Sequence, residues 1–247
     1  MDNAIYTALG GANAALNRQA ITSNNLANAS TNGFRAQIAA YRAIPLNGPT
    51  VETRTLVAES TIGSDSAMGA VHSTGRNLDV ALPQDGWLAV ELPNGREAYT
   101  RNGNIEVDSE GQLRVRGLPL MGDGGALTVP PQSTLTIAAD GTITALGAGD
   151  EPTALVQVGR LKLVNAQARE LVHGDDGLFH SIDANAPPLA ADPDLQVISG
   201  MLEGSNVSPV KSMVEMISTA RNFDMYMKVI SNVDNNAKSA NQLLSAG

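Results

Sequence analysis

The start of the chain carries a helical repeat of small and apolar side chains. Between residues 4 and 28 these positions alternate in steps of four and three, which is the 3.5-residue spacing of a coiled-coil seam. They are Ile5, Leu9, Ala12, Leu16, Gln19, Ser23 and Leu26. The stripe is thin, and Gly10 and Gly11 each reduce helix stability by roughly 1 kcal/mol relative to Ala. We therefore predict an N-terminal helix over residues 1–30 that is marginal on its own in water.

The end of the chain carries the same repeat over a longer stretch. Ser208 is a favourable N-cap and Pro209 is a favourable first helical residue. From there the steps of three and four continue through Met213, Met216, Ala220, Phe223, Met227, Ile230, Asp234, Ala237, Asn241 and Leu244. We predict that residues 201–247 form the C-terminal helical segment, with Met216, Phe223 and Ile230 facing the N-terminal helix.

The terminal helices allow two interpretations. They could be ordinary helices packed on a globular core, or they could pack on each other and on other subunits. Their faces are rich in Asn, Ala and Gly rather than in charge, which favours close approach between helices. We therefore favour a coiled-coil-like pair that also serves as an assembly seam. The predicted seam residues are Ile5, Leu9, Ala12, Leu16 and Leu26 on the first helix and Met213, Met216, Ala220, Phe223, Met227 and Ile230 on the second.

Between residues 75 and 200 the hydrophobic period changes to two and turn sequences become frequent. Short alternating runs occupy 78–82, 86–92, 96–101, 104–108, 112–116, 134–138, 142–146 and 156–164. Asn-Gly, Asp-Gly and Pro-Asn-Gly sequences separate several of these runs, as in β-hairpins. The predicted fold class is therefore α+β, with a central antiparallel β domain over 75–200 between N- and C-terminal helices.

The segment 31–74 gives mixed signals. It contains Pro and Gly at positions that would break any long element, namely Pro45, Gly48, Pro49, Gly63 and Gly69. We predict that this stretch is an extended linking segment.

The sequence NNLANASTNGFR over 24–35 predicts how the first helix ends. Residues from Asn28 to Asn32 favour turns, and Gly33 permits the positive φ that a sharp exit requires. Phe34 is expected to anchor the chain against neighbouring structure, and Arg35 is expected to begin charged outer layers. Asn28, Asn32, Gly33 and Phe34 thus form the predicted helix-exit joint.

Composition narrows the possible partners. The net charge is −9 with a pI near 4.7, and the chain offers no basic stripe for a nucleic-acid backbone. There is no Cys, which excludes disulfides and thiolate metal sites. No apolar run approaches the roughly 20 residues of a membrane span, and the start MDNAIYTALGG is not a conventional secretory signal. We expect a protein without membrane insertion, which would leave the cytoplasm by another route.

The sequence offers little for catalysis. His72, His173 and His180 are the three histidines, and no two of them have the spacing of a helical zinc motif. Nucleophile-elbow, P-loop and dinucleotide-binding motifs are missing. Trp87 lies in an alternating run and is expected in the β core rather than in a ligand site. We therefore predict a protein that is not an enzyme and needs no cofactor or metal.

Three segments resemble the signature motifs of bacterial flagellar rod and hook proteins. They are NNLANASTNGFR (24–35), YTRNGNIEVDSEGQLRVRGLPLMGD (99–123) and GMLEGSNVSPVKSMVEMISTARNFDMYMKVI (200–230). The sequence departs from the usual pattern at Asn32, where many members carry Pro, and at Ile105, where many carry Phe. Within the family, residues 1–16, 78–90 and 227–245 are most similar to a subunit of the proximal rod, and a distal rod subunit is the alternative.

The resemblance implies a structural subunit of the flagellar basal body in the periplasm, exported by the flagellar type III apparatus. Members of the family assemble with copies of themselves and with other rod proteins into a hollow helical tube. Their terminal helices line its inner layer, their β domain faces outward, and the tube transmits torque. Outside the family, a periplasmic cell-wall hydrolase and a β-rich binding module are the remaining candidates. The scattered histidines do not suit the first, and the second leaves the paired terminal repeats without a role.

Overall fold

The computed structural model describes residues 2–45, 55–83, 85–147, 149, 151, 154–167, 170–174, 176–183 and 186–245. The predictions made for Gly48 and Pro49 lie outside these residues. The chain divides into two compact units. The helical unit comprises Met1–Ala27, Gln37–Gly63 and Ser208–Gly247, and the β unit comprises Asn28–Ala36 and Ser64–Val207.

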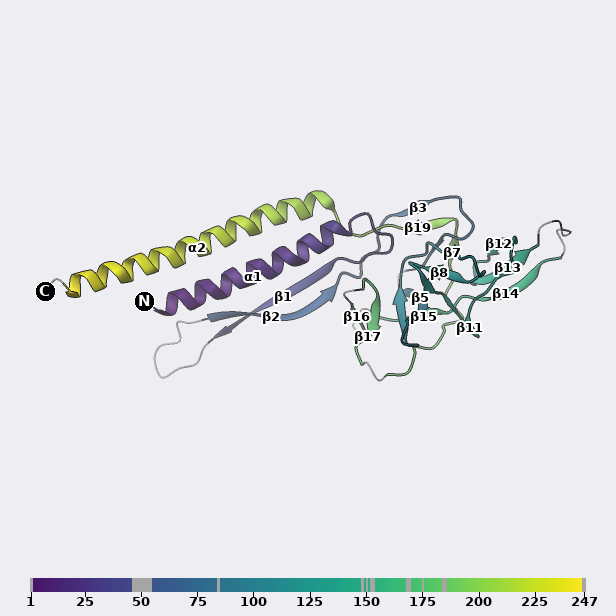
Figure 1. Cartoon of the computed structure of the whole chain (residues 1–247), viewed down its shortest axis with the longest axis horizontal. Coiled ribbons are helices and arrows are strands. Elements are labelled where there is room, and N and C mark those ends of the chain that lie inside the picture. The colour runs from purple at the N-terminus through teal and green to yellow at the C-terminus, as the bar shows by residue number, and fades with distance from the viewer. Residues whose placement is uncertain are drawn as a thin grey trace. The chain divides into compact units, whose positions relative to one another are not determined.

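The helical unit contains the two predicted terminal helices, α1 (Asp2–Ala27) and α2 (Pro209–Ser245). They lie side by side and run in opposite directions, so that both chain ends are at the same end of the unit (Figure 1). At 37 residues, α2 is about 55 Å long for a rise of 1.5 Å per residue. Pro209 is its first residue, as its fixed φ and missing N–H favour. The sequence thus predicts both helices, although α1 ends at Ala27 rather than at residue 30.

A two-stranded sheet completes the helical unit, where the sequence predicts only an extended linking segment. Its strands are β1 (Gln37–Pro45) and β2 (Thr55–Ser64). β1 packs beside α1, and the Asn25 side chain fixes its first residue. The Gln37 N–H donates to Asn25 Oδ1 at 2.8 Å, and Asn25 Nδ2 donates to the Gln37 carbonyl at 2.9 Å. Pro45 and Gly63, which were expected to interrupt any long element, instead lie at strand ends: Pro45 is the last residue of β1, and Gly63 lies at the end of β2.

The β unit is built from short antiparallel pairings. Its largest sheet has the strand order β15-β5-β6-β17-β16, and two three-stranded sheets have the orders β7-β8-β9 and β12-β13-β14. The strands of these sheets are β5 (Gly86–Glu91), β6 (Glu97–Thr100), β7 (Glu106–Val107), β8 (Leu113–Val115), β9 (Leu118–Pro119), β12 (Thr134–Ile137), β13 (Thr142–Leu146), β14 (Val156–Arg160), β15 (Leu163–Asn165), β16 (Leu171–His173) and β17 (Phe179–Ser181).

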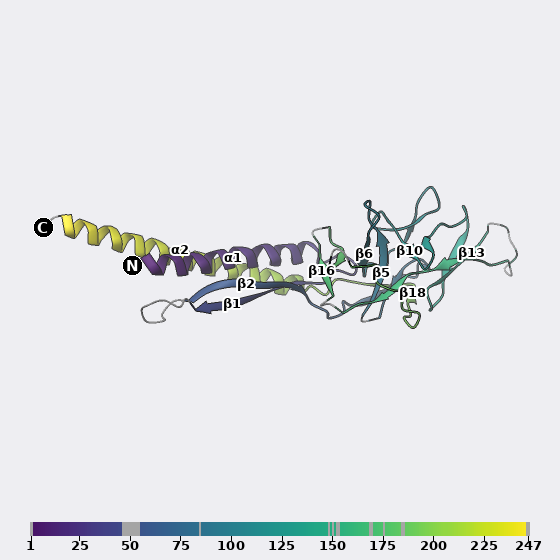
Figure 2. The same cartoon turned by 90° about the horizontal axis from the view of Figure 1, so that it is seen from below.

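Two-stranded pairings form the rest of the unit. They join β3 (Val71–Ser73) with β19 (Met201–Glu203), β4 (Val80–Ala81) with β18 (Ile198–Ser199), and β10 (Met121–Gly122) with β11 (Gly125–Ala126). The first two pairings bring the stretch before the large sheet beside the stretch that precedes α2. β3 and β19 lie side by side in Figure 1, and β18 is labelled in Figure 2.

The alternating runs of the sequence correspond well to these strands. Each of the eight predicted runs contains at least one strand. The run 156–164 is divided, because Val156–Arg160 pairs with β13 while Leu163–Asn165 pairs with β5 in a different sheet. β19 is a further difference, because Met201–Glu203 lies within the segment 201–247 that was assigned to the C-terminal helix.

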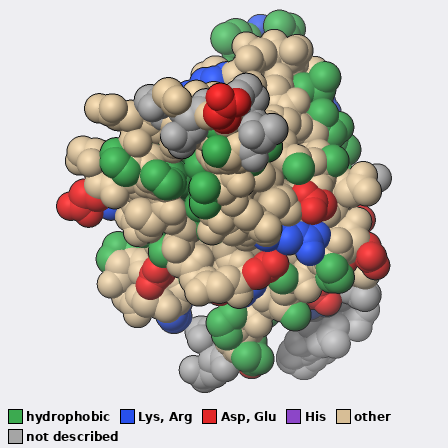
Figure 3. All heavy atoms as spheres, turned by 90° about the vertical axis from the view of Figure 1, so that its right-hand side faces the viewer, with side chains coloured by type: hydrophobic (Ala, Val, Ile, Leu, Met, Phe, Trp, Pro, Cys, Tyr) green, Lys and Arg blue, Asp and Glu red, His purple; other side chains and the backbone are tan. Residues whose placement is uncertain are grey.

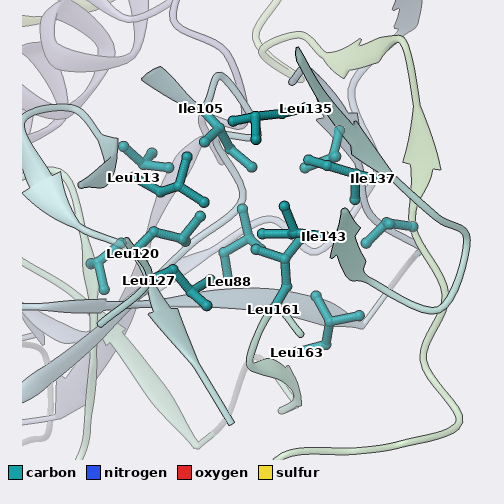
Figure 4. Packing of buried hydrophobic residues seen from close by; sticks show 14 of the residues in the cluster. Leu88, Ile105, Leu113, Leu120, Leu127, Leu135, Ile137, Ile143, Leu161 and Leu163 are labelled. Atoms are coloured by element: carbon teal, nitrogen blue, oxygen red, sulfur yellow. The ribbon is translucent and has the colours of Figure 1, made fainter. Parts of the chain in front are cut away.

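Large aliphatic side chains fill the centre of the β unit. Leu88, Ile105, Leu113, Leu120 and Ile143 have no solvent exposure, and they come together from different strands and loops (Figure 4). Trp87 is buried in a second cluster with Tyr99, Val164, Leu171 and Phe179, so its predicted core position is confirmed. On the face that holds β12, β13 and β14, hydrophobic side chains are scattered among polar and charged ones (Figure 3). Among the described residues, neither helix is long and apolar enough to cross a bilayer.

Candidate functional site

The three sequence motifs meet at one buried carboxylate in the β unit. Glu203, from the C-terminal motif, has a fully buried side chain. Its Oε1 lies 2.9 Å from Nη2 of Arg35, which belongs to the N-terminal motif. Its Oε2 lies 2.7 Å from Nη2 of Arg101, which belongs to the central motif. We refer to Gly33, Arg35, Arg101, Glu203 and Asn206 as the motif cluster.

Arg101 holds the turn before β5 as well as the carboxylate. Its Nε donates to Glu203 Oε2 at 2.8 Å. Nη1 donates to the Gly86 carbonyl at 2.6 Å, and Nη2 donates to the carbonyl of Pro83 at 2.9 Å. The guanidinium carbon also lies 5.6 Å from the centroid of the Trp87 ring, within cation–π range. A fully buried guanidinium is thus supplied with acceptors on several sides, as burial of such a charge demands.

Gly33 brings the chain that follows α1 into contact with this ion pair. Its N–H donates to the Glu203 carbonyl at 2.8 Å, and its φ is +70°, so the predicted positive φ is confirmed. A Cβ at this position would lie 2.4 Å from the Arg101 carbonyl carbon and 2.5 Å from the Asn102 nitrogen. Both are backbone atoms and neither can move aside like a side chain. Glycine is therefore required here for backbone shape and for space.

Asn206 ties together three stretches of the β unit that are far apart in sequence. Its Oδ1 accepts from the Ala36 N–H at 2.7 Å, and its N–H donates to the Phe34 carbonyl at 3.3 Å. Its Nδ2 donates to the carbonyls of Asp65 at 3.3 Å and Ala67 at 2.9 Å. These stretches follow α1, follow β2 and precede α2 along the chain. A single amide thus fixes the β-unit ends of three of the four chain connections to the helical unit.

Phe34 packs into an aromatic row. Its ring meets His173 edge-on with centroids 5.6 Å apart, and His173 meets Phe179 edge-on at 5.0 Å. Phe179 in turn lies 4.5 Å from Trp87. The row connects the exit from α1 to β16, β17 and β5 of the five-stranded sheet. Edge-to-face rings of this kind contribute beyond the area that they bury.

The electrostatics of the motif cluster are those of a structural ion pair. Burial, together with the nearby positive charge of Arg101, lowers the pKa of Arg35 to about 10, while Glu203, Asp65 and Asp85 oppose this shift. Arg35 therefore keeps its proton at neutral pH. The cluster joins a buried carboxylate to two guanidinium groups, which donate hydrogen bonds and accept none. Among the described residues, no group of three or more His, Asp or Glu side chains could hold a metal ion.

Family models match the chain at both ends and in the middle. Residues 5–35 match the model of the flagella basal body rod protein, and residues 81–145 match the D1 domain of the flagellar hook protein FlgE/F/G. Residues 198–243 match the C-terminal model of the flagellar basal body rod FlgEFG protein. The motif cluster takes one residue or more from each matched segment.

Whole-length relatives carry the same description. The flagellar basal-body rod proteins FlgF of Salmonella typhimurium strain LT2 and of Escherichia coli strain K12 are each 56% identical to the chain over 249 residues. The alignments cover 99% of this chain and 99% of each relative. The chain belongs to the family of flagellar basal-body rod proteins.

As a member of this rod family, the chain is a structural protein of the flagellar basal body, which confirms the resemblance found in its sequence. A relative named FlgG, from Buchnera aphidicola subsp. Acyrthosiphon pisum, is 30% identical over 90% of the chain. The similarity to the two FlgF relatives is thus much higher than the similarity to this FlgG relative.

The predicted helix-exit joint is compact, with one correction. Gly33 and Phe34 are buried, and Asn28 and Asn32 are half-buried. The Asn28 carbonyl accepts from the Thr31 N–H at 3.1 Å, which forms the predicted turn. Arg35 does not begin a charged outer layer: only 2% of it is exposed, because Glu203 supplies a buried counter-charge. The isolated motif gave no signal for this, since Glu203 lies far away in the sequence.

The predicted seam residues divide into two groups. Ala12 is buried, and a half-buried set consists of Ile5, Leu26, Met216, Phe223 and Ile230. Leu9, Leu16, Met213 and Met227 are 46%, 51%, 52% and 46% exposed, and Ala220 is also exposed. The exposed residues occupy every second position of the predicted repeats.

The buried faces of both helices lie one residue earlier at those positions. On α1 the sequence Ile5, Ala8, Ala12, Ala15, Gln19, Thr22 and Leu26 is buried or half-buried. On α2 Ser212 and Thr219 are buried where Met213 and Ala220 were expected. The repeat was read from the larger side chains, but small side chains occupy the close contact. The signal that was missed is that Ala, Ser and Thr recur at the same spacing, one residue before those positions of the repeat.

Proposed function

We propose that the chain is a subunit of the proximal rod, in which the two terminal helices form a coiled-coil-like pair and join neighbouring subunits. The rod is then a hollow helical tube that transmits torque and leaves a channel for exported proteins. The similarity to the FlgF relatives supports the proximal position over the distal one. The placement of large apolar side chains on the outside of the helical unit carries the assembly part of the proposal.

That placement is unusual for a helix pair that is complete by itself. Ala8, Ala15, Thr22, Ser212 and Thr219 are buried, and larger side chains remain on the surface. Val210, Val214, Ile217 and Met225 are exposed on α2, at spacings that place them on the face opposite Ser212 and Thr219. Part of this stripe borders a shallow hollow of about 290 Å³. Arg221 lies among these residues, and an exposed apolar stripe with polar neighbours of this kind marks an interaction surface.

α1 carries a second exposed stripe of a different composition. Tyr6, Leu9 and Leu16 are exposed at helical spacing on its surface. The two stripes are unlike, so an interface between α1 of one subunit and α2 of the next joins two different surfaces. Contacts of this heterologous type continue into open helical assemblies when they do not close into a ring. The partners are other copies of the chain or other rod proteins.

The motif cluster supports the mechanical part of the proposal. The chain connections toward α1, β2 and α2 are held together by Asn206 and by the buried ion pairs of Glu203. A load that passes along these connections reaches a dense set of hydrogen bonds rather than one flexible linker. We infer that this cluster stiffens the subunit under torque.

We further propose that the subunit has no catalytic activity or cofactor and resides in the periplasm, without membrane insertion and without binding nucleic acid. Export through the flagellar type III apparatus is the expected route. The absence of Cys suits this route, because an unfolded chain entering an oxidising compartment then cannot form stray disulfides.

The stripe on α1 provides the deciding experiment. The double variant Leu9→Gln and Leu16→Gln, expressed in cells that lack their own copy of the subunit, should fail to build rods and to restore swimming. The variant Asn13→Gln is the matched control, because Asn13 is also an exposed position of α1 and stays polar. Electron microscopy of isolated basal bodies measures the rods, and thermal melting of purified protein checks that the β unit is unchanged. Normal rods in the double variant would refute this use of the stripe.

The buried face has its own test. Phe223→Ala should also impair rod assembly, because Phe223 is half-buried in the helical unit, while melting of the β unit stays the same. A lowered melting temperature of the β unit would contradict this assignment.

A further inference from the structure

Two adjacent glycines of α1 have different surroundings. A Cβ at Gly10 would meet nothing within 4 Å beyond its own helix and chain neighbours. A Cβ at Gly11 would lie 2.6 Å from Cε1, 2.7 Å from Cζ and 3.1 Å from Cδ1 of Tyr226, which belongs to α2. The first two distances are shorter than carbon atoms tolerate, so the methyl group of an alanine would displace the ring. The aromatic ring of Tyr226 thus lies directly against the backbone of α1 at Gly11 but not at Gly10.

We propose that Tyr226 and Gly11 lock the axial register of α1 against α2. The buried faces otherwise consist largely of small residues such as Ala8, Ala15 and Ser212, which interdigitate little and resist sliding weakly. The Tyr226 ring, which is 37% exposed, is a large side chain that occupies the space left by Gly11 on the facing helix. This space exists because Gly11 has no side chain.

The neighbouring heptad positions explain why the lock is selective. A slide by one heptad would place the ring over Ala4 or Arg18, which stand seven residues before and after Gly11. Both carry the Cβ that Gly11 lacks, so the ring fits poorly there. The register also fixes which outward residues of α1 and α2 stand level with each other. Under the proposed function, on which this consequence rests, the lock therefore determines whether a neighbouring subunit meets matching stripes.

Cysteine pairs can report the register, because the natural chain has no Cys. Thr22 lies eleven residues after Gly11 and Glu215 lies eleven residues before Tyr226 (22 − 11 and 226 − 215), about three turns along each antiparallel helix. The pair Thr22→Cys with Glu215→Cys reports the observed register. The pair Ala15→Cys with Glu215→Cys reports a slide of one heptad. Oxidative crosslinking is measured on basal bodies from cells that depend on the variant.

The two glycines supply matched variants. Gly10→Ala should leave the crosslinking of the observed-register pair and rod assembly unchanged. Gly11→Ala should lower that crosslinking severalfold and reduce rod number. Tyr226→Ala removes the ring and should increase crosslinking of the slid pair. Adding it to Gly11→Ala removes the clash, so the double variant should match Tyr226→Ala alone in crosslinking and in rod number.

Each outcome has a distinct meaning. If Gly11→Ala behaves as Gly10→Ala does, the register lock is wrong. It is also wrong if Gly11→Ala abolishes assembly and the added Tyr226→Ala fails to restore it while Tyr226→Ala alone assembles. If the parent chain itself builds no rods, the proposed function fails instead, because the lock is judged only against an assembling parent.

Discussion

The helical unit and the β unit place their large apolar side chains in opposite ways. In the β unit Leu88, Ile105 and Ile143 are fully buried. In the helical unit Ala8 and Thr219 are buried, whereas Leu16 and Ile217 are more than half exposed. Buried apolar area is the main favourable term in folding. The β unit therefore contains its own source of stability. The helical unit leaves much of its apolar area on the surface, where we propose that a partner covers it.

One chain can in this way contain a stable unit and still depend on assembly for the order of the rest. Coupling the order of a segment to partner binding lets the folded unit persist in the unassembled subunit, while the segment gains stability only when neighbours cover it. The glycines and amides of α1 are consistent with this, since they lower helix stability without removing the buried face.

The largest expected contrast between the units lies in hydrogen exchange. In dilute unassembled protein, the amides of α1 and α2 should exchange at close to unprotected rates. The amides of β5 and β6 should exchange only through global unfolding, which requires about 5–15 kcal/mol in stable domains. Mass spectrometry of the exchanged protein measures both. Protected terminal helices in a dilute monomer would show that the helical unit is stable without a partner.

The next largest effect should follow the loss of the central carboxylate. Glu203→Gln leaves Arg35 and Arg101 buried without their shared counter-charge, and breaking a buried pair in this way costs about 3–5 kcal/mol. Urea unfolding of the full chain, followed by Trp87 fluorescence, reports the β unit. Glu106→Gln is the control, because Glu106 is exposed and should change the unfolding free energy by less than about 0.5 kcal/mol. Equal effects of the two variants would show that the buried pair adds no stability.

Gly33→Ala should have a smaller but still distinct effect. An L-residue at positive φ lowers the free energy of unfolding by about 1–2 kcal/mol. The collision with the Arg101 backbone lowers it by about 1–3 kcal/mol more. Gly95→Ala separates the two contributions, because Gly95 has a φ of +75° but open space around it. Urea unfolding should show a larger loss for Gly33→Ala, and similar losses would mean that the backbone relaxes around the new methyl group.

The smallest effect should come from acid. Hydrogen bonds from the Gln112 and Thr142 N–H groups are the first causes that lower the pKa values of Asp108 and Asp140 in the β unit. Because these folded-state pKa values lie below the unfolded value of about 3.9, their contribution is present above that pH and is lost as pH falls through the folded values. The urea midpoint of the β unit should therefore decline below about pH 4. Asp108→Asn should reduce the decline, and an unchanged pH dependence would remove Asp108 as a cause.

Local sequence patterns predicted the elements but not how distant motifs combine. Asn-Gly turns and alternating runs depend on neighbouring residues, so strands such as Thr142–Leu146 could be read directly. The burial of Arg35 depends on Glu203, which no local pattern reveals. The hairpin of β1 and β2 was missed because Pro45 and Gly63 were read as interruptions rather than as strand ends.

The helix faces show a second limit. Hydrophobicity ranks Leu9 above Ala8 and Met213 above Ser212, so a search for the apolar stripe selects the larger residue. Close helix contact instead favours the smaller one. In such a helix the spacing of small residues indicates the close helix contact, and the spacing of large apolar residues indicates the exposed stripe.

The hydrogen bond between Ala36 and Asn206 joins residues 170 positions apart. Such a contact closes only after most of the chain is available, and contacts of high sequence separation form slowly. A chain that is threaded through a channel from either end and folds as it emerges can complete this joint only near the end of its passage. In a truncated chain that lacks Glu203 and Asn206, Arg35 and Arg101 would have no shared counter-charge. The hydrogen bonds that Asn206 makes to the connecting stretches would also be missing. The motif cluster can therefore form only in a chain that contains both its N-terminal and its C-terminal residues.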